Sequence, residues 1–93
     1  MSIVTLKVSA TPGDTVQSYW VTVHGKRLKM TNDEGEIDLE QPGKYILVWH
    51  FIGREGATLG IKGEVDGQTV VQIKQSKISA GEIAGAGIAR FEI

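Results

Sequence analysis

Residues 31–52, TNDEGEIDLEQPGKYILVWHFI, carry the pattern that decides the fold. Residues 32–35 have the Asn, Asp and Gly of a tight turn. Residues 36–40 then alternate acidic and apolar side chains, which is the period of a strand with one face in water. Pro42-Gly43 fits a type II turn, with Pro at its second position and Gly at its third. A longer apolar strand follows at 44–52.

The strand at 44–52 is apolar on both faces, unlike the segment before it. One face carries Tyr45, Leu47, Trp49 and Phe51. The other face carries Ile46, Val48, His50 and Ile52. Such a strand is either covered on both sides, or covered on one side while its second face meets a partner.

The rest of the chain divides into further short strands. Alternating segments occupy residues 3–9, 16–24, 26–30, 59–65, 69–74 and 88–93. Asp66-Gly67 is a strong hairpin signal, whereas residues 76–87 are small and are interpreted as a loop with at most one weak helical turn around Ser79–Ala84. We therefore expect a single domain, residues 1–93, with an all-β fold. The expected architecture is a two-sheet antiparallel β-sandwich of about seven or eight short strands, and a small β-barrel is the alternative.

The composition bounds the function. The chain has 93 residues, and ten basic against eleven acidic side chains leave a formal charge of −1. This balance argues against a dedicated nucleic-acid binder and against a polybasic membrane-surface module. The absence of cysteine excludes disulfides, thiol nucleophiles and thiolate zinc sites. No segment approaches the ~18 apolar residues of a membrane span, and the N-terminus lacks the features of a signal peptide. A full-length chain is thus expected to be cytoplasmic or exported without a classical leader.

The central stretch resembles the prealbumin-like β-sandwich modules, over roughly residues 15–52. These immunoglobulin-like sandwiches include carboxypeptidase regulatory-like domains, transthyretin-like domains and the repeat domains of bacterial surface adhesins. The matching positions are Thr31, Asp33, Gly35, Ile37, Leu39, Pro42, Gly43, Tyr45 and Leu47. The resemblance implies a sandwich that is usually non-catalytic and serves as an accessory, adhesive or assembly module.

Adhesin modules of this kind often carry a Lys–Asn isopeptide cross-link, and Lys7 lies in a first strand as such a lysine should. The last strand, at 88–93, offers no asparagine, and the only asparagine of the chain is Asn32, in a turn. We therefore do not expect the cross-link here.

Two faces are candidate binding surfaces. The first is aromatic and polar, and a sugar ring could stack on an exposed Trp20 while its neighbours bond the hydroxyls. The residues of this candidate site are Trp20, Ser18, Thr22 and His24, joined by Arg54 if loops bring it near. The competing interpretation is that Trp20 packs beneath a loop or across an interface.

The second candidate surface is the other face of the strand at 44–52. If Ile46, Val48, His50 and Ile52 are exposed, their stripe is too apolar to leave in water, and a self-complementary dimer would bury it. The competing interpretation is that this face is ordinary core.

No motif predicts catalysis. His24 and His50 are the only histidines and have no metal-ligand spacing, so no metal site and no cofactor are expected. The chain also has no recognisable nucleophile with a base partner. Two oppositely charged arms are predicted to pair across strands. The basic arm has Lys26, Arg27 and Lys29, and the acidic arm has Asp33, Glu34, Glu36, Asp38 and Glu40.

The sequence therefore predicts a non-catalytic interaction or assembly module that forms a homo-oligomer, or binds another protein, through an apolar sheet face. The alternative is a small carbohydrate-binding protein that uses Trp20.

Overall fold

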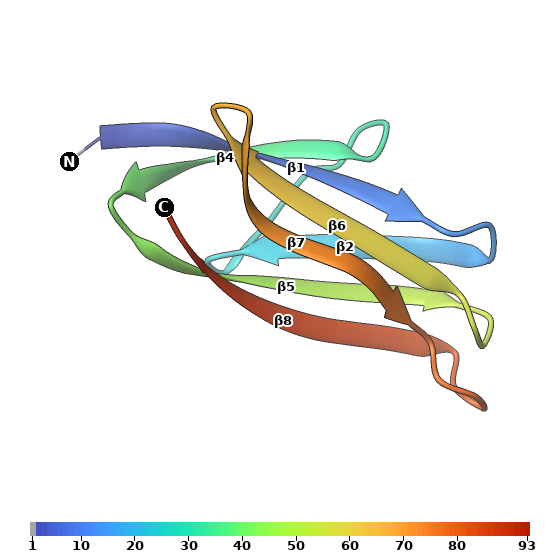
Figure 1. The fold of residues 1–93 in the computed structure, drawn as a ribbon. Helices are drawn as coiled ribbons and strands as arrows, with labels where there is room; N and C mark the ends of the chain where they lie inside the picture. The colour runs from blue at the N-terminus through green and yellow to red at the C-terminus, as the bar shows by residue number, and fades with distance from the viewer. Residues whose placement is uncertain (1) are drawn as a thin grey trace.

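The computed structural model describes residues 2–93, which form eight strands and no helix. The strands are β1 (Ser2–Pro12), β2 (Val16–Val23), β3 (Lys26–Arg27), β4 (Glu34–Gln41), β5 (Lys44–Gly53), β6 (Thr58–Val65), β7 (Gln68–Lys77) and β8 (Ala84–Glu92). They build two sheets of four strands, in the orders β4-β1-β6-β7 and β3-β2-β5-β8, and all pairings are antiparallel. The two sheets face each other as layers (Figure 1). The predicted all-β, two-sheet antiparallel sandwich is confirmed.

One hydrophobic core fills the space between the sheets. Its largest fully buried side chains are Phe51, Leu6, Leu47, Leu59, Ile78, Val8, Val21 and Val23. β5 contributes alternate residues to it: Tyr45, Leu47, Trp49 and Phe51 are all buried. Of the two apolar faces that the sequence left open, this one belongs to the core. Burial of this apolar surface is the main force that holds the two sheets together.

The chain passes from one sheet to the other between β4 and β5, and Tyr45 fixes this corner. The Tyr45 hydroxyl donates a hydrogen bond of 2.7 Å to the backbone oxygen of Glu40. The ring lies so close that a Cβ added at Gly43 would be 2.7 Å from it. Gly43 does not have a positive φ, so the predicted type II turn at Pro42-Gly43 is wrong. Glycine is required here because it lets the backbone approach the Tyr45 ring.

Trp49 joins the two sheets at the edge where β7 and β8 lie side by side (Figure 1). Its indole Nε1 donates to the Ser76 hydroxyl on β7, at 3.1 Å. Its ring lies over Gly87, where an added Cβ would overlap it, and a Cβ at Gly85 would be 2.5 Å from the Phe51 ring. Two glycines of β8 thus leave room for two aromatic rings of β5.

The prediction of a loop over 76–87 is wrong for half of that segment. β7 continues to Lys77 and β8 begins at Ala84, so only residues 78–83 connect them, and they form no helical turn. Glycine weakens an isolated strand because it has no side chain to pack. In β8 the aromatic rings of the neighbouring strand cover the glycines, which supplies the missing packing.

The predicted pairing of the basic and acidic arms is also wrong. β3 has only two residues and pairs with β2, whereas β4 pairs with β1 in the other sheet. Among residues 2–93, the ion pairs within 4.0 Å are Lys44–Glu92 and Lys62–Glu64, and neither involves the two arms. The acidic β4 instead meets β1, where the Thr5 hydroxyl donates to Asp38 at 2.9 Å.

Three tight turns have positive φ at both central residues: His24-Gly25, Asn32-Asp33 and Asp66-Gly67. This is the conformation of type I′ turns, whose twist matches that of the flanking strands. The turns predicted within residues 32–35 and at Asp66-Gly67 are confirmed.

Tyr19 ties the turn at Asn32-Asp33 to β2. Its hydroxyl donates to Asp33 Oδ1 at 2.5 Å, and the Asp33 backbone oxygen accepts from the Ala10 amide of β1 at 2.8 Å. This turn therefore contacts both sheets. Burial first, and then the hydrogen bond to Asp33 and its negative charge, raise the pKa of Tyr19 well above the ordinary value of about 10.

We predict that Gly87→Ala lowers the free energy of unfolding by about 1–3 kcal/mol, because the new methyl group overlaps the Trp49 ring. Ala86→Ser is the matched control, since it also adds one non-hydrogen atom but on the exposed side of the same strand. It should change stability by less than about 0.5 kcal/mol. Urea unfolding at low protein concentration measures both. Equal losses for the two variants would contradict the packing described for Gly87.

We predict an alkaline loss of stability that depends on Tyr19. A raised pKa in the folded state means that the folded protein holds the phenol proton more tightly. The resulting stabilisation is complete below pH ~10 and disappears as the pH rises toward the folded-state pKa. Tyr19→Phe should lack this component, and one late tyrosinate transition in the ultraviolet absorbance should vanish with it. A late transition that persists in the variant would contradict the assignment to Tyr19.

Candidate functional site

The outer face of the sheet β3-β2-β5-β8 carries a continuous apolar strip over β5 and β8. Because the odd-numbered residues of β5 face the core, its even-numbered residues face outward. Ile46 is 43% exposed, and Ile88 on β8 is 66% exposed. Register places Val48 beside Ile88, His50 beside Ala86 and Ile52 beside Ala84. We call the following set the apolar outer face: Ile46, Val48, Ile52, Ala84, Ala86 and Ile88.

An aromatic and basic row borders this strip. Trp20 on β2 is stacked on His50 of β5, with ring centroids 5.9 Å apart and an interplanar angle of 22°. The guanidinium of Arg27, on β3, lies 5.5 Å from the centroid of the Trp20 ring, within the range of a cation–π contact. Both neighbours come from the same outer face, so Trp20 is half-buried among side chains of its own sheet.

The structure brings together only part of the predicted Trp20 site. Ser18 and Thr22 share the outer face with Trp20, beside Ile52 and Val48 of β5. His24 lies in the turn after β2, with its ring edge-on to Tyr45 at 5.1 Å between centroids.

Arg54 follows β5 at the opposite end of the sheet, where its amide donates to the Thr15 oxygen at 3.4 Å. At ~3.3 Å per residue along β2, His24 and Arg54 are about 25–30 Å apart. His24 and Arg54 are therefore not part of one site.

The predicted oligomer residues do lie together. Ile46, Val48, His50 and Ile52 follow one another along the outer side of β5. Val48 and Ile52 are partly covered by their neighbours, whereas Ile46 and His50 are exposed. The sequence did not indicate the contribution of residues 84–87 of β8, because it predicts a loop over 76–87 and a strand only from Ile88 onward. The only signal was the alternation of residues 84–88, in which Ala84, Ala86 and Ile88 occupy every second position and would share one face of a strand.

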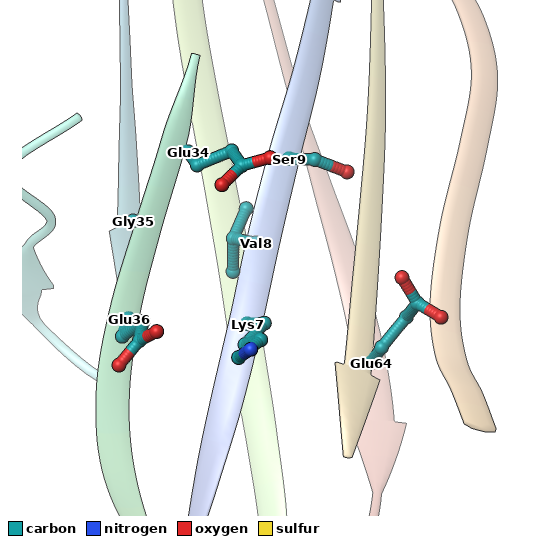
Figure 2. Close-up of a pocket in the computed structure, with 7 residues that line it drawn as sticks. All are labelled: Lys7, Val8, Ser9, Glu34, Gly35, Glu36 and Glu64. Carbon is teal, nitrogen blue, oxygen red and sulfur yellow. The ribbon is translucent and has the colours of Figure 1, made fainter. Parts of the chain in front are cut away.

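The outer face of the other sheet, β4-β1-β6-β7, carries a polar depression. It is lined by Lys7, Val8, Ser9, Glu34, Gly35, Glu36 and Glu64. Figure 2 shows Lys7 on β1 between Glu36 of β4 and Glu64 of β6, as their register requires. These opposite charges support the pairing of β1 with its two neighbours. Sequence alone could not reveal this group, because it depends on which distant strands pair.

The chemistry available on these surfaces is limited. Within residues 2–93, no group of three His, Asp or Glu side chains is placed to hold a metal ion. The same residues include no helix that could cross a membrane. What the described residues present is apolar contact area on one sheet and opposite charges on neighbouring strands of the other.

Comparison with known proteins gives no relative: no family model, no curated protein and no solved structure matches the chain.

Proposed function

We propose that this chain is a non-catalytic β-sandwich interaction module that self-associates through the apolar outer face. The observation that supports this most directly is the exposure of Ile46 and Ile88 on neighbouring strands, next to Val48. Side chains that would be core in a covered sheet stand in water here, and a contiguous patch of this kind is typical of a contact surface.

A second copy of the chain is the partner that this face suits best. In a two-fold dimer the same patch meets itself, so an apolar strip needs no separately evolved complement. Amphipathic and charged residues border the strip on two sides. Trp20 on β2 and Arg27 on β3 lie along one side, and Arg90 on β8 lies beside Ile46 at one end. An apolar centre with a polar rim is the usual anatomy of such an interface.

The non-catalytic part of the proposal has its own support. Each histidine packs against an aromatic ring, His24 against Tyr45 and His50 against Trp20. Neither arrangement aims an imidazole at a serine or a lysine as a general base would be aimed. The glycan alternative has weaker support, because Arg27 and His50 already contact the Trp20 ring on which a sugar would stack.

We predict that Ile46→Glu weakens self-association by at least about tenfold, because the dimer would bury a charge in an apolar contact. The new carboxylate would stand beside Arg90, so the fold should tolerate it. The matched control is Ile3→Lys on the other sheet, where Ile3 is 65% exposed and lies beside Glu40. Each variant replaces an exposed isoleucine by a charged residue that lies beside a residue of opposite charge on the neighbouring strand.

Sedimentation velocity over a concentration series measures both variants against the parent chain. The proposal requires that Ile3→Lys associates like the parent while Ile46→Glu does not. Equal behaviour of the two variants, or a parent chain that stays monomeric throughout, would refute it.

A further inference from the structure

Three of the four edge strands of the sandwich are guarded against pairing with another chain. β3 is only two residues long and both are basic. β4 is acidic at every second position, at Glu34, Glu36, Asp38 and Glu40. The pairing of β7 with β6 has two register shifts, which bend the strand. Short length, charge and bulges are the devices that keep sheet edges from joining.

β8 is the fourth edge, and it has none of these devices over most of its length. It runs from Ala84 to Glu92 and pairs with β5 without a register shift. Its charged residues, Arg90 and Glu92, lie at one end. The exposed Ile88 stands in its middle. Among residues 2–93, β5 is its only neighbour in the sheet.

The free backbone groups of β8 can be identified from the bonds at its two ends. The Gly53 amide donates to the Ile83 oxygen, and Gly43 and Ile93 exchange both of their backbone bonds. Odd-numbered residues therefore face β5. In an antiparallel ladder the direction alternates, so the even-numbered residues from Ala84 to Glu92 turn their N–H and C=O groups to the open edge.

We propose that β8 pairs antiparallel with β8 of a second copy, about a two-fold axis at Ala86, so that the two sheets join into one. The proposal rests on the proposed function, self-association, and adds to the contact through the apolar outer face a second contact, made by backbone groups at the sheet edge. In this register Ala84 lies opposite Ile88 of the second copy, and Glu82 lies opposite its Arg90. The two-fold axis makes each of these pairs occur twice.

Charge favours this register over the two adjacent registers, in which the axis lies at residue 85 or 87. Moving the axis to residue 87 would set Glu82 against Glu92 of the second copy, which is repulsive. Moving it to residue 85 would set Glu82 against Ile88 and remove the partner of Arg90. Of these three registers, only the axis at Ala86 places Glu82 opposite Arg90, while Glu92 already pairs with Lys44 of its own chain. It also places the two apolar outer faces side by side, because the even-numbered residues of β8 belong to that face.

Cysteine substitution tests the register directly, because the chain contains no cysteine. In the proposed dimer the two Ala86 Cα atoms are about 5.5 Å apart, which a disulfide can span. Ala86→Cys should form a disulfide-linked dimer under mild oxidation. Ala84→Cys is the matched control, since its two copies would be roughly 13 Å apart along the strands. Equal cross-linking of the two variants, or none at Ala86, would overturn the register.

Charge exchange tests the same contact without a covalent bond. Glu82→Arg alone, or Arg90→Glu alone, should weaken the dimer by about fivefold through like-charge pairs, and the double variant should restore it. A double variant that does not regain the dimer affinity of the parent chain would overturn the proposal. If Ile46→Glu dissociates the protein while the Ala86 cross-link and the charge exchange both fail, the edge contact is refuted and the face contact stands. If the reverse is found, the edge contact stands and the face contact is refuted.

Discussion

The Trp49 side chain holds the two sheets at a fixed spacing along the β7–β8 edge. Its ring lies over Gly87 of the neighbouring strand, and its indole N–H reaches Ser76 in the opposite sheet. The ring can take this position only if the odd-numbered residues of both β5 and β8 face the core. Their even-numbered residues must then face water. The exposed apolar face is therefore a direct consequence of how the core is packed.

The sequence predicted the parts of the fold that depend on local pattern. The apolar run from Tyr45 to Phe51 identified the central strand and its two faces, although not which of them is buried, and residue types such as Asp66-Gly67 identified the tight turns. It failed where pairing between distant segments decides the structure. The first half of β8, residues 84–87, was missed because Gly85 and Gly87 disfavour a strand until aromatic rings cover them. The partner of acidic β4 was missed because nothing local says that it pairs with β1 rather than β3.

The two outer faces of the sandwich differ in a way that suits an assembly module. On the sheet that contains β1, charges stand beside opposite charges and polar partners, as Lys7 does between Glu36 and Glu64. On the sheet that contains β5, Ile46 and Ile88 stand beside other apolar residues. The charges of the first surface have opposite charges on neighbouring strands of the same chain, whereas the apolar side chains of the second gain from being covered. Part of the candidate surface was predictable, since the apolar second face of residues 46–52 can be identified in the sequence. The part supplied by residues 84–87 of β8 depended on tertiary packing.

Small-angle X-ray scattering of the unmodified chain, over a dilution series, tests self-association most directly. A single copy has a Cα radius of gyration of 13.3 Å and principal extents of 46 × 23 × 21 Å. The account predicts a forward scattering that rises with concentration to at least about twice the monomer value, as expected for a closed symmetric dimer. The radius of gyration should rise with it. A forward scattering that corresponds to one chain at every concentration, with a constant radius of gyration, would contradict the account.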